Sequence, residues 1–584
     1  MLSGLAGSPM GFLDIFSGRG RRRDEAEGES SNARMSDPEH RKRVVYAYHE
    51  QTKHSPYRFA VGPFELDWEN QPDPFRRWEG SQLLPLDLVP STAHPGYREA
   101  LGEGGVTPAA LDRRFLSQLL FDSLALSAWK QAGDTRWALR VNPSSGNLHP
   151  TEGYVLTPAI QGLCDSPAIF HYAPREHGLE LRAPIPEDLW NRLVSDLPPG
   201  SFFAGLTSIH WREAWKYGER AFRYCQHDAG HAIAALSIAG AGLGWKAELV
   251  DDLGSDELAQ LLGVYAEQGP DAELPEALLL FTPQGNPTAP RAFPTLTAEF
   301  RDLSWQGRPN DLSPEHVDWD AIDMAALASA KPRTETEAAW QPPRHDVVPE
   351  GSDVSLRETI RQRRSCQALD GRTGMPSSVF FRMLEATLPR AGRFPFNALP
   401  WSPRIHLAIF VHRVDGMEPG LYWLQRDPAR SEAVRAACTP EFLWQKPRGC
   451  PDELPLSLLF PMPLHSQAAQ LSCNQDIAGD GAFSLGMLAD FEDSIEEQGA
   501  WFYQRLFWET GVLGQRLYLE AEAHGLRSTG IGCFFDDPVH SILGLRGKTL
   551  QSLYHFTVGK AVDDARLTTL PAYPPERSGG DAPA

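Results

Sequence analysis

The sequence predicts an α+β protein built from two similar domains that pair within one chain. Its 584 residues exceed the roughly 100–200 residues of one domain. In addition, residues 214–245 (AWKYGERAFRYCQHDAGHAIAALSIAGAGLGW) resemble residues 499–526 (GAWFYQRLFWETGVLGQRLYLEAEAHGL). Placing Asp228 on Glu509 also aligns Gly218 with Gly499, Phe222 with Tyr503 and Gly230 with Gly511. An internal duplication of this size is typical of a pseudo-dimer that keeps its site at the interface.

Each copy of the repeat is predicted to be a long helix. Small and apolar residues recur in both at spacings of three and four, and both segments end at a glycine. Short segments with a β-branched and aromatic bias are predicted to be strands, with one sheet in each half. These strands are Gly153–Thr157, Ala168–Tyr172, Leu179–Arg182, Ile405–Val411, Gly420–Gln425, Ala482–Ala489 and Tyr554–Val558.

The composition along the chain suggests five segments. Residues 1–40 are expected to be a disordered tail, because a charged Gly/Ser/Glu stretch dominates them. Met35 is an alternative start of the protein. Residues 41–301 and 351–575 are the two predicted domains. Residues 302–350, rich in Pro, Asp, Glu and Ser, are the expected linker, with one short helix near 319–330. Residues 576–584 are the expected C-terminal tail.

Charge and cysteine content exclude several classes of protein. The 55 Lys and Arg against 76 Asp and Glu leave a net charge of −21, which disfavours nucleic acid or an anionic membrane as the main partner. A local basic pocket for one phosphate remains compatible with that charge. The seven cysteines form no CxxC pair, so we expect neither a disulfide framework nor a cysteine zinc site, and a cytoplasmic location. No run approaches the roughly 18 apolar residues that span a bilayer.

One polar turn stands out in the first half. Residues 142–150 read NPSSGNLHP. The hydroxyls of Ser144 and Ser145, the amide of Asn147 and free backbone N–H groups can converge there on a planar heteroaromatic ligand. The alternative is an ordinary loop of Ser, Asn and Gly.

These residues resemble the nitroreductase family. PSSxNxxP is its flavin-contacting signature, and the stretch RVNPSSGNLHPTEGYVL is similar to the SagB-type (azoline dehydrogenase-like) branch. YHEQTKH, DWENQPDPFRRW and KYGERAFRY resemble the same branch, in the same order. The similarity runs from about residue 41 to 575, apart from the linker. It implies two nitroreductase-like domains that form an intramolecular pseudo-dimer, with FMN between them.

The resemblance assigns further flavin contacts to the second half. Arg363, Arg364 and Ser365 match the phosphate-binding motif, in which arginine forks grip the phosphate; the alternative is a solvated helix face. Gly530, Ile531 and Gly532 match the loop that lies against flavin N5; the alternative is a plain connection from helix to strand. Gln475 matches an amide directed at the flavin pyrimidine. Lys560, or Arg566, is expected to replace basic residues that many relatives carry near the C-terminus.

The two interface sites are expected to be unequal. The first half opens with TKHS (residues 52–55) in place of RRS (residues 363–365) and has no TGIG, and the second half has FNALPWSPR in place of PSSGN. We therefore expect one FMN per chain.

Lys216 and Tyr217 are the predicted catalytic pair. SagB-type azoline dehydrogenases carry a Lys-Tyr pair in this context as proton-handling residues, and a Lys and a Tyr can serve as base and acid when hydride leaves a substrate carbon. The second half has Glu497 and Gln498 at this place, so the repeat does not require the pair for packing. The alternative is a solvated lysine and a core tyrosine.

Two further motifs carry little weight. His227 and His231 have the spacing of a zinc helix, but Asp replaces the expected Glu and no third ligand is evident, so we expect no metal. Gly240–Gly244 (GAGLG) resembles a dinucleotide motif but ends a helix and follows no strand.

The sequence thus predicts an FMN-dependent oxidoreductase of nitroreductase or SagB type, with hydride transfer to or from flavin N5 at the domain interface. The substrate is open: a modified peptide bearing an azoline, or a nitro or quinone compound reduced with NAD(P)H. The alternative is a flavin-binding or degenerate partner in a biosynthetic complex, without turnover of its own. The expected assembly is a monomer acting as a pseudo-dimer, or a higher homo-oligomer, that binds neither nucleic acid nor membrane.

Overall fold

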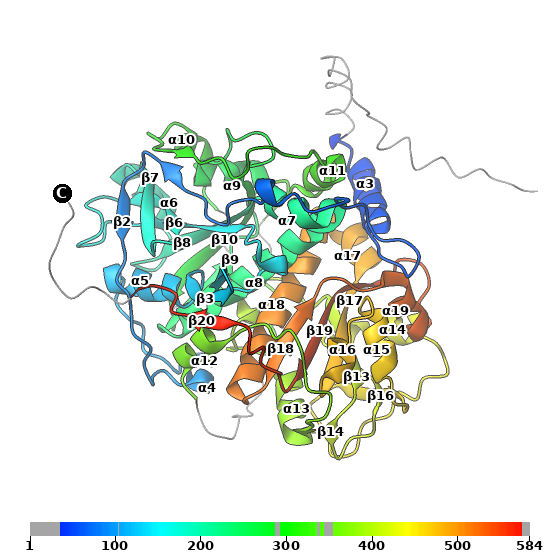
Figure 1. The fold of residues 1–584 in the computed structure, drawn as a ribbon. Helices are drawn as coiled ribbons and strands as arrows, with labels where there is room; N and C mark the ends of the chain where they lie inside the picture. Colours follow the sequence, from blue (N-terminus) through cyan, green and yellow to red (C-terminus); the bar gives the residue numbers. More distant parts are fainter. Residues whose placement is uncertain (1–34, 103, 286–292, 336–338, 344–353, 575–584) are drawn as a thin grey trace, which may run out of the picture.

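The computed structural model describes residues 35–102, 104–285, 293–335, 339–343 and 354–574 (Figure 1). Each half contains one antiparallel sheet with helices around it, and the long helices α8 (Ala221–Ala241) and α18 (Phe502–Ala523) lie between the halves. The α+β prediction and the duplication are confirmed. The predicted tail up to residue 34 lies outside the described residues.

The two sheets share one topology. The first has the strand order β2 (Leu83–Pro85), β7 (Gly178–Pro184), β6 (Ala168–Ala173), β5 (Thr151–Thr157), β8 (Phe202–Ser208), β10 (Leu274–Pro283), β9 (Trp245–Leu249). The second has the order β16 (Leu456–Phe460), β15 (Gly420–Leu424), β13 (Ile405–Val411), β17 (Phe483–Asp490), β19 (Leu550–Gly559), β18 (Arg527–Ile531). Apart from the edge strand β2, each position in one sheet has its counterpart in the other.

All seven predicted strands are present, as β5, β6, β7, β13, β15, β17 and β19. Two of the missed strands, β8 and β10, lack an alternating pattern. β8 (FFAGLTS) is buried along its whole length, so both of its faces are apolar or small. β10 (LPEALLLFTP) contains a continuous apolar run that periodicity cannot distinguish from a buried helix.

Helices α8 and α18 approach most closely at Gly230 and Gly511, the pair that the repeat aligns. A Cβ on Gly230 would lie 2.3 Å from the carbonyl oxygen of Trp508, and a Cβ on Gly511 would lie 2.3 Å from that of His227. The aligned rings of Phe222 and Tyr503 stack with an interplanar angle of 2°. These reciprocal contacts place a pseudo-twofold axis between the helices.

Two shorter helices precede the long ones and end in the same way. α7 (His210–Tyr217) stops at Gly218 with φ 53°, and α17 (Phe491–Gln498) stops at Gly499 with φ 101°. Positive φ at these stops favours glycine. Lys216 and Tyr217 therefore occupy the last turn of α7, and Glu497 and Gln498 occupy the matching turn of α17.

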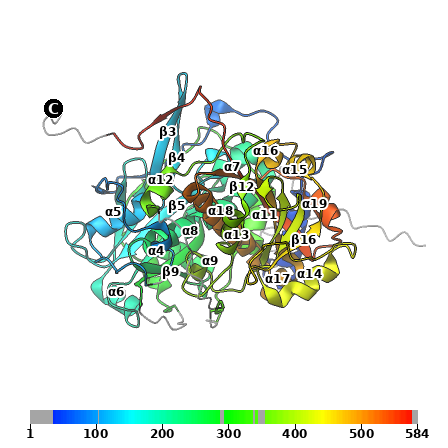
Figure 2. The same ribbon diagram turned by 90° about the horizontal axis from the view of Figure 1, so that it is seen from below.

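Further helices cover the sheets. They are α5 (Arg113–Phe121), α6 (Glu187–Val194), α9 (Ser255–Leu262), α10 (Thr297–Arg301), α13 (Ser377–Glu385), α14 (Ser431–Ala437), α15 (His465–Leu471), α16 (Ile477–Asp480) and α19 (Asp536–Leu543). The hairpin of β3 (Leu126–Ala132) and β4 (Thr135–Arg140) projects from the first half (Figure 2).

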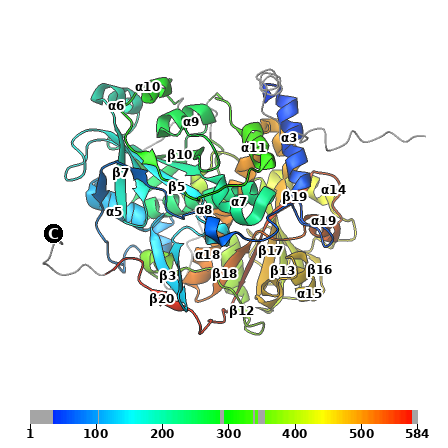
Figure 3. The ribbon, with the colours of Figure 1, turned by 45° about the horizontal axis from the view of Figure 1, so that its top comes forward.

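The first and last described elements each pack on the opposite half. Helix α3 (Pro38–Gln51) reaches the second half, where Tyr46 contacts the ring of Phe491 and the Nδ1 of His49 lies 3.2 Å from the hydroxyl of Tyr503. Strand β20 (Thr568–Leu570) pairs with β3 of the first half (Figure 1). The short helix expected near 319–330 is α11 (Asp320–Ser329), which lies beside α3 (Figure 3).

The helix that precedes the RRS motif (residues 363–365) has an unexpected counterpart. α12 (Leu356–Gln362) pairs with α4 (Tyr97–Ala100) through reciprocal hydrogen bonds: Tyr97 N donates to Val354 O (2.7 Å) and Leu356 N donates to Pro95 O (3.1 Å). The pseudo-twofold axis therefore relates α12 to α4. The expectation that TKHS is the first-half equivalent of RRS is wrong, because the order of helices, and not a local motif, defines the equivalence.

Within the part of the chain that the structure describes, no helix combines the length and apolarity that crossing a membrane requires.

The helix crossing yields a stability prediction. Gly511→Ala forces backbone atoms apart, and such overpacking costs about 1–3 kcal/mol or more. That cost exceeds the roughly 1 kcal/mol by which alanine favours a helix over glycine. We expect thermal unfolding at a lower temperature. Gly62→Ala serves as the control, because the nearest atoms to a Cβ on Gly62 would lie 3.9 Å away, at an ordinary contact distance. A Gly511→Ala protein as stable as the parent would show that the close approach is unnecessary.

Candidate active site

A carboxylate from α8 holds the PSSGN turn. The turn forms the short helix η2 (Ser145–Asn147) just before β5. Asp228 accepts hydrogen bonds from the backbone N–H of Ser145 (3.0 Å) and from its hydroxyl (3.0 Å). In the second half, Glu509 accepts in the same way from Arg404 N (3.0 Å), just before β13. The sequence aligned the two carboxylates but did not reveal this role.

Hydrogen bonds within the first half also fix the rest of the turn. The side-chain amide of Asn147 donates to Ala138 O (2.8 Å), and His149 N donates to the hydroxyl of Ser144 (2.8 Å). Gly146 and Asn147 have φ values of 59° and 62°. The turn therefore has a set shape, with Gly146 exposed at its tip.

Lys216 and Tyr217 lie directly against this turn. A Cβ on Gly146 would lie 2.5 Å from the hydroxyl oxygen of Tyr217, so a side chain at position 146 would displace that ring. The Tyr217 ring packs on Tyr224 at 4.7 Å, and the Nζ of Lys216 lies 5.3 Å from the Tyr217 ring centroid. Burial raises the pKa of Tyr217 well above its ordinary value, which keeps the hydroxyl protonated.

Two buried carboxyl groups lie beneath the same turn. Glu213 is fully buried, and the hydroxyl of Ser144 and the charge of Lys216 only partly favour its ionised form. Burial, followed by the nearby charge of Asp228, raises the pKa of Glu213 well above its ordinary value. Burial also raises the pKa of Asp228 to about 7. The sequence analysis missed Glu213, because a glutamate in a polar helical turn gives no sign of burial.

Arg363 is the basic group of the second half that faces the first. Its side chain is 3% exposed, and its Nη2 donates to Arg140 O at the end of β4 (3.2 Å). The guanidinium lies over the ring of Tyr518 at 5.0 Å. Its Nε and Nη1 have no partner among the described residues. Burial lowers the pKa of Arg363 to about 10, so the group stays charged at neutral pH.

The hydroxyl of Tyr518 joins the two second-half motifs. It lies 2.8 Å from the hydroxyl of Ser365 and accepts from Gly530 N at 2.8 Å. Ser365 also forms a β-bridge with Ser528, whose buried hydroxyl has no partner among the described residues. Ser365 and the TGIG segment are thus one structural unit.

The TGIG segment is a strand and not a loop. Thr529, Gly530 and Ile531 belong to β18, at the edge of the sheet, where glycines and a threonine weaken the strand signal in the sequence. A Cβ on Gly530 would lie 1.8 Å from the hydroxyl oxygen of Tyr554, and one on Gly532 would lie 2.4 Å from the ring of Tyr224. These glycines make room for tyrosines on one side of the segment.

The remaining assigned residues lie in two different environments. The amide of Gln475 donates to Ser472 O (2.8 Å) and Cys533 O (3.0 Å), so it ties a turn to the end of the TGIG segment. Lys560 lies just beyond β19 at an exposed position. Arg566, its alternative, pairs with Asp564 (2.7 Å).

The TKHS segment supports this region from the first half. His54 N donates to the buried carboxylate of Asp536 (2.9 Å), which also pairs with Arg220 (3.1 Å) and Arg223 (2.9 Å). Arg220 donates to Gly532 O as well (3.2 Å). Burial alone would raise the pKa of Asp536, but the two guanidinium groups outweigh it and lower that pKa.

His227 and His231 face the second half. The Nδ1 of His227 lies 2.9 Å from the hydroxyl of Thr510, and the Nε2 of His231 lies 3.3 Å from that of Tyr554. Their contacts connect the two halves.

The opposite interface is filled by side chains. Arg505, which aligns with Tyr224, places its guanidinium 5.6, 4.5 and 4.9 Å from the ring centroids of Trp401, Trp501 and Trp508 and pairs with Asp251 (2.6 Å). The short helix η4 (Phe396–Ala398), the counterpart of η2, packs against β9. The two interfaces therefore differ in chemistry.

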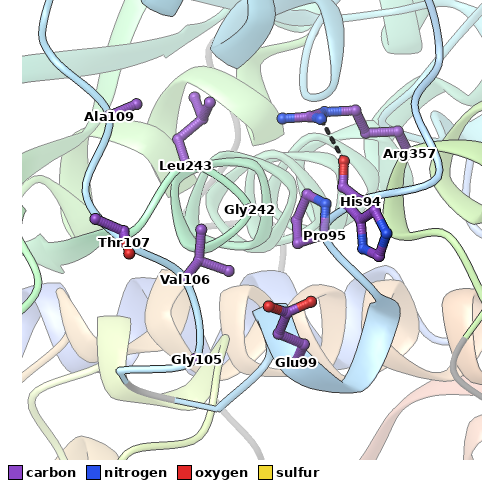
Figure 4. Close-up of a pocket in the computed structure, with 10 residues that line it drawn as sticks. All are labelled: His94, Pro95, Glu99, Gly105, Val106, Thr107, Ala109, Gly242, Leu243 and Arg357. Atoms are coloured by element: carbon purple, nitrogen blue, oxygen red, sulfur yellow. Dashed lines mark hydrogen bonds between the residues drawn. The ribbon is translucent and has the colours of Figure 1, made fainter.

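A cavity of about 390 Å³ lies near α4, away from the PSSGN turn (Figure 4). Its lining residues include Glu99, Val106, Leu243 and Arg357, and Arg357 donates to His94 O at 2.7 Å.

The pseudo-symmetry also shows which residue replaces Arg363 in the first half. Arg363 lies seven residues after Leu356, and Gly104 lies seven residues after the equivalent Tyr97. The first half thus has a glycine where the second half has its buried arginine.

Comparison with known proteins agrees with this architecture. Residues 360–560 match the model of the Nitroreductase family. The family model thus covers most of the second half. None of the curated proteins searched matches the chain.

Solved structures extend the similarity to both halves. A candidate nitroreductase from Anabaena variabilis is 22% identical, with a TM-score of 0.64, over 89% of this chain and 99% of that chain. A candidate nitroreductase from Ralstonia eutropha is 16% identical, with a TM-score of 0.26, over 38% of this chain and 95% of that chain. The first match shows a shared fold along most of the length. The chain is thus a tandem of two nitroreductase-like domains.

Proposed function

We propose that this chain is an FMN-dependent oxidoreductase with one flavin site between its two nitroreductase-like domains. Ser144, Ser145 and Asn147 would line the site from the first domain, and Arg363 with Ser365 from the second. The Nitroreductase match of residues 360–560 supports this class.

The observation that carries the proposal is the state of Arg363. A buried guanidinium with two nitrogens unpartnered among the described residues is costly unless an anion binds there. Ser365 and Ser528 form the neighbouring β-bridge, and both carry hydroxyls. The Arg363 guanidinium and these two hydroxyls suit a phosphate, which accepts several charge-assisted hydrogen bonds. The residues present fit the phosphate end of FMN.

Bound FMN would supply hydride exchange at N5. The residues of this chain would manage protons and access. Tyr217 keeps a protonated hydroxyl beside Gly146, and Lys216 lies next to its ring. The buried Glu213 resists ionisation beneath the turn, and Asp228, with a pKa of about 7, can exchange a proton near neutral pH.

The Lys-Tyr pair favours oxidation of an azoline in a modified peptide over simple nitro or quinone reduction. Removing hydride from a ring carbon also requires removal of a proton, for which a lysine base and a tyrosine acid are suited. Hydride exchange between NAD(P)H and a flavin requires no such pair. Only the first domain carries Lys216 and Tyr217, at the complete interface.

A flavin-binding role without turnover has one observation in its favour. The N–H of Gly530, expected to face flavin N5, donates to Tyr518, and the hydroxyl of Tyr554 covers the same glycine. An absorbance spectrum of the purified protein identifies bound flavin. Loss of its visible bands under NAD(P)H, or under a reduced substrate, separates an enzyme from a binder.

Arg363→Ala tests the phosphate assignment. Loss of a charge-assisted contact costs roughly 1.5–3 kcal/mol, so we expect FMN affinity to fall about 10- to 150-fold in a fluorescence titration. Arg372→Ala removes an exposed arginine from the same domain and serves as the matched control. Circular dichroism verifies folding of both variants. Unchanged affinity in folded Arg363→Ala protein would disprove the assignment.

Lys216→Ala and Tyr217→Phe test the proton-handling pair. Both variants should retain FMN and lose turnover of an azoline peptide by roughly 10²–10⁴, the usual contribution of a general acid or base. Gln498→Ala, at the position that matches Tyr217 in the second domain, is the control. A double variant that binds flavin and turns the peptide over at the parental rate would exclude the azoline mechanism.

A further inference from the structure

Two segments that are distant in sequence meet at the end of the TGIG segment. Phe535 N donates to Leu471 O (2.8 Å), and the amide of Gln475 bridges Ser472 O and Cys533 O. Each segment carries a cysteine, Cys473 in a turn with φ 55° and Cys533 just after Gly532. Backbone and side-chain contacts therefore hold these two positions side by side.

The two thiols contact each other. Cys473 and Cys533 are joined by a side-chain hydrogen bond, and both are partly exposed. They also lie close to Tyr224, one of the aromatic residues around the PSSGN turn. Two adjacent, accessible thiols are candidates for a disulfide, which forms when their Cβ atoms come within about 3.5–4.5 Å.

The surroundings make Cys533 the more reactive of the two. The hydrogen bond from Cys473 lowers the pKa of the Cys533 thiol, with burial opposing and the guanidinium of Arg220 assisting. Burial raises the pKa of the Cys366 and Cys438 thiols to about 12 and that of Cys450 to about 11. The thiolate is the nucleophilic form, so Cys533 is expected to react first.

We propose that Cys473 and Cys533 are a redox-active pair that forms a reversible disulfide at the edge of the site between the domains. The oxidant is a low-molecular-weight disulfide such as glutathione disulfide. The sulfur of Cys533 attacks one sulfur of the oxidant and releases one thiol, which leaves a mixed disulfide. The sulfur of Cys473 then attacks the Cys533 sulfur and releases the second thiol. The two cysteines lose two electrons and two protons. The oxidant takes up both and leaves as two free thiols.

The disulfide would link the Cys473 turn covalently to the TGIG segment. Gly532, the residue before Cys533, already lies under the ring of Tyr224 and accepts a hydrogen bond from Arg220. The oxidation state of the pair would therefore fix one wall of the interface. The proposal rests on the proximity of the two thiols and does not depend on bound flavin.

The test is peptide mapping of the full-length protein. Reduced protein is treated with glutathione disulfide, alkylated, digested and analysed by mass spectrometry, with and without later reduction by dithiothreitol. We expect a peptide pair linked through Cys473 and Cys533, loss of both alkylation sites, and recovery of both after reduction. Cys164→Ser, which changes a partly exposed cysteine in the first domain, should form the same link.

The single variants test the order of attack. In Cys473→Ser the glutathione adduct on Cys533 should accumulate, because the second thiol is absent. In Cys533→Ser the adduct on Cys473 should form at least about tenfold more slowly. Full alkylation of both cysteines after treatment of the parent protein, or a stable adduct on Cys533 with Cys473 intact, would overturn the proposal.

Discussion

The close contact of α8 and α18 at Gly230 and Gly511 is the constraint on which the rest of the structure depends. Backbone meets backbone there, and no side chain fits between the helices. This contact brings Asp228 and Glu509 near the axis, where each holds the turn that leads into the first central strand of its own sheet. The spacing between the helices thus sets the positions of both turns relative to the opposite domain.

One pseudo-symmetric scaffold supports two chemically different interfaces. On one side, Arg363 and the tyrosines at positions 217, 224, 518 and 554 surround the PSSGN turn and the TGIG segment. On the other, Arg505 lies among three tryptophans and pairs with Asp251. On the second side, the buried Arg505 has a carboxylate partner in Asp251. On the first side, two nitrogens of the buried Arg363 have no hydrogen-bond partner among the described residues. Under the proposed function, this difference, and not the fold, directs the ligand to one interface.

Much of this organisation could be predicted from the sequence, because repeated helices and alternating strands leave local patterns. Ser144, Ser145 and Tyr217 were recognisable from a motif, and the structure brings them together. Glu213, Tyr518 and Tyr554 were not, because their importance comes from burial and from contacts between segments far apart in the chain. The expected equivalence of TKHS and RRS is wrong for the same reason: the counterpart of α12 is α4, and only pairing in space reveals it.

The amount of FMN bound per chain tests the central claim most directly. Full-length protein is saturated with FMN and freed of excess, and the released flavin is quantified against protein. One complete interface predicts one FMN per chain. Two FMN molecules per chain would contradict the inequality of the interfaces, and no bound FMN at saturation would contradict the flavin site itself.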